Sequence, residues 1–251
     1  MNSAAQHARV ERFRELHRPG KPLLLPNAWD AASARTLAGS GFQAIGTTSY
    51  GVALSAGKPD ADGQTRAETL SLARTLARLD VLATVDIEAG FSDDAEAVAD
   101  LAGELARLGI AGINIEDGAG DGGLRNLDLA AAKIRAIKEA VPQLFVNART
   151  DSYWLAGGDG DLDETLKRCR AYRDAGADGV FVPLLGGLDA IREVTSSIDA
   201  PLNVLHQPDG PRTAELAAAG VARISSGSHL FRTAMAAMTD AMAAIGRGDV
   251  S

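Results

Sequence analysis

The chain has 251 residues, of which 46% are hydrophobic and 23% charged, as in an ordinary globular protein. Its 25 Lys and Arg residues against 33 Asp and Glu residues give a net charge of −8, which argues against nucleic-acid binding through a broad basic surface. The single cysteine excludes an internal disulfide and fits a reducing compartment.

The N-terminal segment is polar. It lacks the apolar core of a signal peptide, and no segment approaches the roughly 18 apolar residues of a membrane span. We therefore expect a cytoplasmic protein without membrane association. Residues 3–17 are predicted to form an amphipathic helix that covers part of the fold.

Short β-like runs alternate with segments of helical periodicity, such as residues 94–109 and 162–178. The runs are LLLP (23–26), AIGTT (44–48), LATVDI (82–87), GINIED (112–117), LFVNAR (144–149), GVFVPL (179–184), PLNVL (201–205) and RISSG (223–227). Eight such strands predict an α/β fold, a closed (β/α)8 TIM barrel, as a single domain over residues 1–251. The rival is a doubly wound open sheet, but no G-x-G-x-x-G loop follows the first strand.

Polar residues interrupt strands that should be nearly all apolar. Thr84, Asp86 and Glu88 are expected to share one face of a strand, because alternate residues point the same way. The other strands carry Asn114, Glu116, Asn147, Arg149, Asn203, Arg223 and Ser225. The apolar faces must meet the helices, so the polar faces line the barrel, mostly at its C-terminal mouth, where barrel enzymes build active sites.

Three of these residues are carboxylates that converge: Asp86, Glu88 and Glu116. Arg149 cannot balance three charges, whereas a hard divalent cation can, and oxygen ligands favour Mg²⁺ or Mn²⁺. No Cys or His lies near these strand ends, which argues against zinc. The alternative is an internal Arg–carboxylate network that only orders the barrel.

Five segments together carry a family resemblance. They are LLLPNAWDAASAR (23–35), TTSYGVALSAGKPD (47–60), VDIEAGFSDD (85–94), GINIEDG (112–118) and VNARTD (146–151). Over roughly residues 10–235 the chain resembles the isocitrate lyase/phosphoenolpyruvate mutase superfamily. The resemblance implies a Mg²⁺-dependent barrel that cleaves or forms C–C or P–C bonds of small 2-oxo or 2-hydroxy carboxylates through a pyruvate-like enolate.

Residue roles follow from the resemblance by position. Asp86, Glu88 and Glu116 resemble the metal ligands, some acting through water, and Asp60 resembles an outer acidic residue near the metal. Members usually form tetramers that exchange the last helix between neighbours.

The resemblance also implies how the substrate is held. Tyr50, Gly51 and Val52 resemble the loop whose backbone N–H groups bind the substrate carboxylate, and Arg149 resembles the arginine that contacts substrate oxygens. The predicted substrate-binding set is completed by Asp60 and Asn203. The predicted catalytic residues are Arg149, Glu116 and Tyr50.

The chain departs from the family after the fourth predicted strand. Residues 116–126 (EDGAGDGGLRN) have neither the K-[KR]-C-G-H motif of the lyases nor the lysine of the mutases and phosphonopyruvate hydrolases. This glycine-rich loop is either a mobile lid or a plain surface loop, and Arg125 is its one candidate substrate contact. Cys169 lies in a helical pattern and is predicted to be packed rather than catalytic.

The usual proton donor is therefore absent. Tyr50, Tyr153, His206 and water remain as candidate proton carriers. The metal ligand usually present as Asp is Glu88, whose longer arm is expected to shift the cation or its waters.

Three functions remain open from the sequence. The first is a Mg²⁺-dependent lyase or decarboxylase of a small 2-oxo or 2-hydroxy dicarboxylate, with oxaloacetate decarboxylation as the best fit. The second is phosphonopyruvate hydrolase or phosphoenolpyruvate mutase chemistry, and the third is a non-catalytic oxo-acid-binding protein. A Schiff-base aldolase is disfavoured because no predicted strand carries a lysine.

Overall fold

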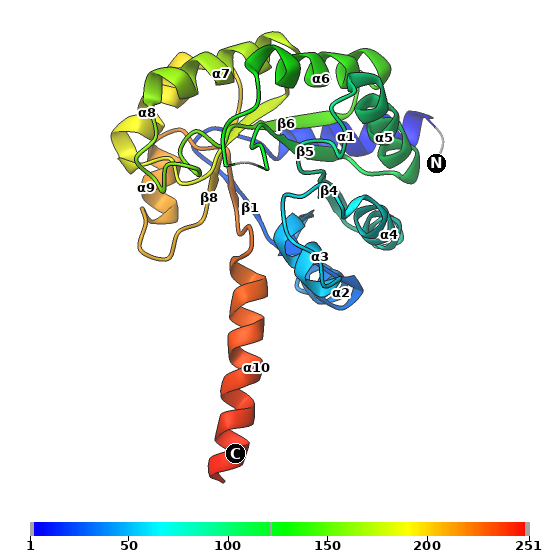
Figure 1. Cartoon of the computed structure of the whole chain (residues 1–251), viewed down its shortest axis with the longest axis vertical. Coiled ribbons are helices and arrows are strands. Elements are labelled where there is room, and N and C mark those ends of the chain that lie inside the picture. The colour runs from blue at the N-terminus through cyan, green and yellow to red at the C-terminus, as the bar shows by residue number, and fades with distance from the viewer. Residues whose placement is uncertain (1–2, 121, 249–251) are drawn as a thin grey trace.

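The computed structural model describes residues 3–120 and 122–248, and in it helices surround a barrel of parallel strands (Figure 1). The strands are β1 (Leu23–Leu25), β2 (Asn27–Ala28), β3 (Ala44–Thr47), β4 (Leu82–Asp86), β5 (Gly112–Glu116), β6 (Phe145–Arg149), β7 (Gly179–Val182), β8 (Leu202–Leu205) and β9 (Arg223–Ser225). The helices are α1 (Ser3–Glu15), α2 (Ala31–Gly39), α3 (Ser49–Ser55), α4 (Arg66–Leu76), α5 (Ala95–Leu108), α6 (Leu127–Ala140), α7 (Leu162–Asp174), α8 (Gly187–Ser197), α9 (Thr213–Ala218) and α10 (His229–Arg247).

The barrel closes at Pro26, which divides the first predicted strand into β1 and β2. β1 pairs with β9 and β2 pairs with β3, so one short segment joins the two edges of the sheet. Proline has no N–H to donate to a ladder, but its carbonyl accepts a hydrogen bond from Gly46 N at 2.9 Å. The predicted (β/α)8 barrel is therefore confirmed, with nine short strands where eight were expected.

Helix ends follow ordinary capping chemistry. The side chains of Asp94, Asn126 and Asp161 accept hydrogen bonds from first-turn N–H groups of α5, α6 and α7. Gly109 ends α5 in the left-handed conformation at φ 100°, which turns the chain directly into β5. These caps define where the helices begin and end, and therefore where the neighbouring strands lie in the barrel.

Helix α1 covers the N-terminal mouth of the barrel. Its Phe13 meets Phe145 of β6 edge to face at 5.3 Å, within a buried cluster that also contains Val10 and Leu82. Gln6 Nε2 donates to the Ile110 carbonyl at 2.7 Å, which fastens the helix to the start of the β5 region. The predicted helix over residues 3–17 is confirmed within two residues, and it leaves only the C-terminal mouth open.

Helix α10 projects away from the barrel (Figure 1). Its Met238, Met242 and Ile245 side chains are 60%, 62% and 55% exposed, which is unusual for large apolar groups of one helix. In the described ranges, no helix combines the length and apolar character needed to cross a bilayer.

Candidate active site

A cavity of about 140 Å³ opens at the C-terminal ends of the strands. Its charged lining is acidic in excess: the carboxylates are Asp60, Asp86, Glu116 and Asp151, and the cations are Arg149 and Arg232. One wall is apolar and is formed by Trp154, Leu155, Phe181, Pro183 and Leu205. The cavity therefore offers charged groups for the polar atoms of a ligand and an apolar wall for its hydrocarbon part.

Asp86 ends β4 at the cavity, as predicted. Its N–H donates to Thr47 Oγ1 at 2.8 Å, and its own Oδ1 accepts from Glu88 N at 3.0 Å. Burial raises the pKa of the Asp86 carboxyl to about 6, although the charge of Arg149 opposes this shift. Burial thus disfavours the ionised Asp86 carboxyl more than the charge of Arg149 stabilises it.

Arg149 is held between two carboxylates on neighbouring segments. Its Nη1 lies 2.8 Å from Glu116 Oε2, and its Nε donates to Asp151 Oδ1 at 2.6 Å. Burial alone lowers the pKa of Arg149, but the charges of Glu116 and Asp151 outweigh burial and raise it. Burial raises the pKa of Glu116 well above its usual value, against the pull of Arg149. The guanidinium is therefore a fixed charge in the cavity wall.

Two aromatic rings flank this guanidinium. Arg149 Cζ lies 5.5 Å from the ring centre of Trp154 and 5.6 Å from that of Phe181. Rings at this distance attract a cation and restrict its side-chain rotamers. Trp154 is 43% exposed, so it reaches from Arg149 to the open rim of the cavity.

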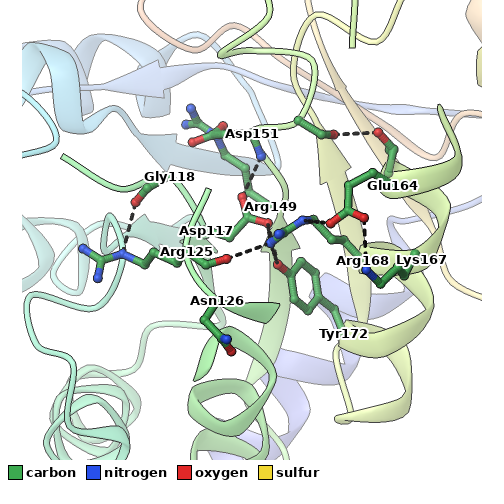
Figure 2. A network of polar contacts seen from close by, with 12 residues as sticks. Asp117, Gly118, Arg125, Asn126, Arg149, Asp151, Glu164, Lys167, Arg168 and Tyr172 are labelled. Carbon is green, nitrogen blue, oxygen red and sulfur yellow. Dashed lines mark hydrogen bonds and ion pairs between the residues drawn. The ribbon is translucent and has the colours of Figure 1, made fainter. Parts of the chain in front are cut away.

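A buried network behind the cavity supports Asp151 (Figure 2). Asp117, only 1% exposed, accepts hydrogen bonds from Tyr172 Oη, from Arg168 Nη1 at 3.0 Å and from the Asp151 backbone N–H at 2.7 Å. Arg168 and Tyr172 both project from α7. The network links α7 to the segment that holds Arg149. Asp117 and Asp151 are not among the predicted site residues, although both lie in the family-like segments 112–118 and 146–151.

Glu88 does not point into the cavity. β4 ends at Asp86, and Glu88 adopts a positive φ of 51°, so it does not share a strand face with Thr84 and Asp86. Its carboxylate instead accepts hydrogen bonds from Gly63 N at 3.0 Å and from Thr65 Oγ1. The predicted shared face is thus wrong at Glu88, because the strand geometry ends two residues earlier. Its role as a metal ligand stays a prediction.

The glycine-rich loop after β5 folds back on itself. Ala119 N donates to the Gly123 carbonyl at 2.8 Å, and Gly118 and Ala119 line the cavity. Arg125 Nε donates to the Gly118 carbonyl at 3.1 Å, and its Nη1 donates to Asp93 Oδ1 at 2.5 Å. Arg125 thus pairs with Asp93 and does not line this cavity, and its role as a substrate contact stays a prediction.

Tyr50, Gly51 and Val52 lie in the short helix α3 rather than in a loop. Val52 N donates to the Thr48 carbonyl at 3.1 Å within the helix, whereas the N–H groups of Tyr50 and Gly51 belong to its first turn, which has no internal acceptors. A Cβ at Gly51 would lie 2.6 Å from Trp29 Cβ, so close packing explains this glycine. Tyr50 alone of the three lines the cavity.

The remaining candidates lie away from the cavity lining. Tyr153 is 6% exposed, and the His206 ring packs at 5.3 Å against His229 at the start of α10. Asn203 is buried inside the barrel, where its Oδ1 accepts from Ser225 Oγ at 3.3 Å. Cys169 is fully buried in α7, as predicted, and burial raises the pKa of its thiol to about 12.

Three carboxylates, those of Asp60, Asp86 and Glu116, face one cavity and offer the oxygen ligands that a hard divalent cation prefers. Asp60 Oδ1 is buried without a hydrogen-bond partner among residues 3–120 and 122–248, and it faces the same cavity as Asp86 and Glu116. Within those ranges no three His, Cys, Asp or Glu side chains are close enough to form a complete cage. A cation here would therefore keep water in part of its coordination shell, as Mg²⁺ commonly does.

Comparison with known proteins identifies the family of this chain. The family model for phosphoenolpyruvate phosphomutase matches residues 13–246. Over 237 residues the chain is 46% identical to the uncharacterized protein Rv1998c of Mycobacterium tuberculosis, covering 94% of this chain and 90% of the relative. It is 34% identical to 2-methylisocitrate lyase of Bacillus subtilis over 208 residues, covering 79% and 67%.

The fold agrees with solved structures as well. Phosphoenolpyruvate phosphomutase from Streptomyces platensis subsp. rosaceus superposes with a TM-score of 0.83 at 26% identity, covering 96% of this chain and 88% of that one. The matched family model spans nearly the whole barrel, including the strand ends that carry Asp86, Glu116 and Arg149. This chain therefore belongs to the isocitrate lyase/phosphoenolpyruvate mutase superfamily, whose members are lyases and mutases.

Proposed function

We propose that this protein is a Mg²⁺-dependent lyase or decarboxylase of a small 2-oxo or 2-hydroxy dicarboxylate. The observation that carries the proposal is the unbalanced charge of the cavity. Arg149 is already paired with Glu116 and Asp151, and within residues 3–120 and 122–248 no Lys, Arg or His forms an ion pair with Asp60 or Asp86. A divalent ion would compensate them and leave the site able to accept an anionic substrate.

The proposed ion would be held by Asp86, Glu116 and Asp60, and would act as a Lewis acid on the substrate's keto oxygen and carboxylate. Mn²⁺ can take the place of Mg²⁺ because it prefers the same oxygen ligands. The protein's own contribution is to fix these carboxylates: Thr47 orients the end of β4, and Arg149 orients Glu116.

Two arginines are suited to hold the substrate. Nη2 of Arg149 makes no hydrogen bond to any described residue, so it can donate to a substrate oxygen in the cavity. Arg232 lies across the cavity with Cζ 4.2 Å from the Tyr50 ring centre, and within the described ranges no carboxylate pairs with it. A second cation on the opposite wall favours a substrate with two anionic groups.

Decarboxylation of oxaloacetate is the simplest reaction for this site. The C3–C4 bond breaks, CO₂ leaves, and the bond electrons move into the C2–C3 enolate of pyruvate, whose oxygen carries the developing charge. A proton then adds to C3, and of the predicted carriers only Tyr50 and water have access to the cavity. Because loss of CO₂ requires an electron sink more than a dedicated acid, the missing loop cysteine is no obstacle.

The decisive experiment is a screen of 2-oxo and 2-hydroxy dicarboxylates with and without MgCl₂. Product pyruvate is measured by coupled reduction, and Asp86→Ala serves as the inactive control. We expect metal-dependent pyruvate formation by the wild type only. Unchanged activity in Asp86→Ala would refute the assignment of this cavity as the active site.

Phosphorus–carbon chemistry is the second candidate, because the matching family model is that of phosphoenolpyruvate phosphomutase. Phosphorus NMR of phosphonopyruvate incubated with the protein separates it from the first candidate. We rank it lower because residues 116–126 hold no lysine. Tight oxalate binding without turnover of any substrate would instead indicate a non-catalytic oxo-acid-binding protein.

We further propose that the chain is a cytoplasmic homo-oligomer, a tetramer by family resemblance, in which α10 is exchanged between neighbours. The exposed Met238, Met242 and Ile245 on a helix that leaves its own barrel support this. Light scattering is expected to give a mass well above the 26.0 kDa of one chain. Its partners are otherwise small carboxylates, and we expect neither nucleic acid nor membranes among them.

A further inference from the structure

Arg223 crosses the inside of the barrel. It starts on β9 and is fully buried, and its Nη2 donates to Asn114 Oδ1 on β5 at 3.2 Å. Three strands, β8, β7 and β6, separate β9 from β5 in the sheet. The contact is therefore made through the barrel interior and not between neighbouring strands.

A buried arginine without a carboxylate partner is unfavourable for folding. Among residues 3–120 and 122–248 no carboxylate forms an ion pair with Arg223, and its Nε and Nη1 have no hydrogen-bond partner. Burial lowers the pKa of Arg223 to about 9 against the opposing charge of Asp86, and Arg223 stays protonated at neutral pH. Both groups that act on this charge, the Asp86 carboxylate and the Asn114 amide, line the cavity, which directs attention to a role there.

The contact fixes the orientation of the Asn114 amide. Its Oδ1 accepts both from Arg223 Nη2 and from Asn147 Nδ2, the latter at 3.0 Å. A carbonyl oxygen with two donors cannot exchange places with the amide nitrogen without losing both hydrogen bonds. Asn114 Nδ2 is therefore held on the other side, and no described residue accepts from it.

Asn114 lines the floor of the cavity and is the lateral neighbour of Asp86 in the sheet. Its free donor consequently lies beside the carboxylates proposed to hold the cation. A neutral N–H₂ group here can bind an anionic oxygen without competing with that cation for Asp86. An arginine or lysine at this position would compete.

We propose that Arg223 is a positioning residue that holds the Asn114 amide so that Nδ2 donates to a carboxylate or enolate oxygen of the bound substrate. The inference rests on the proposed function, because it assumes that small carboxylates bind in this cavity. It adds a substrate contact from the barrel floor, whereas Arg149 and Arg232 act from the walls.

The sharpest variant is Asn114→Asp. It keeps an acceptor oxygen for both Arg223 and Asn147, but replaces the donor at the cavity by a second acceptor. We expect the affinity for oxalate, measured by calorimetry in MgCl₂, to fall at least tenfold, since a hydrogen bond to a charged group is lost. The thermal midpoint should stay the same or rise. An oxalate affinity within twofold of the wild type would overturn the proposal.

A second set of variants tests whether Arg223 acts through Asn114. Arg223→Lys keeps the charge but is too short to reach across the barrel, so it should weaken oxalate binding as Arg223→Met does. The double variant Asn114→Ala with Arg223→Lys should bind oxalate no more weakly than the weaker-binding of the two single variants. Wild-type affinity in Arg223→Lys, or multiplying effects in the double variant, would overturn the positioning role. If Arg223→Met does not fold, Arg223→Lys and the double variant still test the positioning role.

The wild type separates this inference from the proposed function. If the wild-type protein binds no oxalate in MgCl₂ and turns over no dicarboxylate, the proposed function fails, and this inference fails with it. If the wild type binds oxalate and the Asn114 and Arg223 variants bind it equally well, only the inference fails.

Discussion

Arg149 and Asp151 form an ion pair two residues apart along the chain, with Arg149 Nε 2.6 Å from Asp151 Oδ1. Glu116 takes a second nitrogen of the same guanidinium from the neighbouring strand. The Arg149 guanidinium, at the end of β6, is thus committed to two carboxylates. This commitment, more than the number of acidic residues, makes the rest of the cavity depend on an added cation.

Replacing Asp86 should abolish activity without unfolding the protein. Asp86→Asn removes the charge but keeps the shape, and we expect kcat/KM with any accepted dicarboxylate to fall at least about a hundredfold. The thermal midpoint should be unchanged or higher, since a buried charge is lost. Asp189→Asn, on the exposed face of α8, is the matched control. Equal activities of the two variants would contradict the metal site.

Glu88 should contribute more to the stability of the segment around Gly63 and Thr65 than to binding of the cation. Glu88→Gln weakens the hydrogen bonds to Gly63 and Thr65, so we expect a loss of about 1–2 kcal/mol in unfolding free energy. Thr65→Val should cause a similar loss. Mn²⁺ affinity, measured by electron paramagnetic resonance, should change less than threefold. A tenfold drop in Mn²⁺ affinity in Glu88→Gln but not in Thr65→Val would instead support the predicted ligand role.

Trp154 should influence substrate binding more than turnover. Trp154→Ala removes the ring beside Arg149 and part of the apolar cavity wall. We expect KM to rise about three- to tenfold with little change in kcat, which is the range of a partly exposed cation–π contact plus lost apolar area. Trp154→Phe keeps a ring and should recover most of the loss. Identical kinetics for Ala and wild type would exclude this contact.

Asp117 should be a strong determinant of stability. Asp117→Asn leaves the Arg168 guanidinium buried with Glu164 as its remaining carboxylate partner, and weakens the hydrogen bond to Tyr172. We expect the unfolding free energy to fall by about 2–4 kcal/mol in denaturant titrations. Because Asp117 also holds the Asp151 backbone, kcat/KM should fall as well. A variant as stable as the wild type would show that this network is not structural.

His17 should make stability depend on acidity. Its Nδ1–H donates to the Phe13 carbonyl at 2.8 Å, and its ring stacks on Phe145. Burial, with the nearby charge of Arg223, lowers the pKa of His17 to about 3. From its ordinary value of about 6.5 down to 3, the unfolded chain binds the extra proton, so stability is complete above this window and falls as pH decreases through it.

The loss from His17 should reach about 2 kcal/mol at pH 5 relative to pH 8. His17→Phe keeps the ring contacts and removes the titration, so its unfolding free energy should depend less on pH. His7→Phe, exposed on the same helix, should retain the wild-type dependence. Parallel pH profiles for His17→Phe and wild type would refute the assignment.

Much of the barrel can be read from residue order. Alternating apolar runs and helical periods predict the (β/α)8 barrel because each parallel strand needs a helix to cover it. The polar residues at strand ends, Asp86, Glu116 and Arg149, predict where the cavity lies, since parallel strands present their C-terminal ends at one mouth. These predictions need only the local periodicity of apolar and polar residues, which is visible in the sequence.

The direction of side chains beyond the strands required the tertiary structure. Glu88 leaves the cavity because its backbone adopts φ 51° after β4 ends, and the alternation rule holds only inside a strand. Arg125 turns to Asp93, 32 residues earlier in the chain, for a partner that no local pattern identifies. Arg223 meets Asn114 across the barrel only because closure at Pro26 brings β9 and β5 to face one another. Sequence periodicity therefore determined which residues line the barrel, while chain closure and side-chain length decided which of them meet.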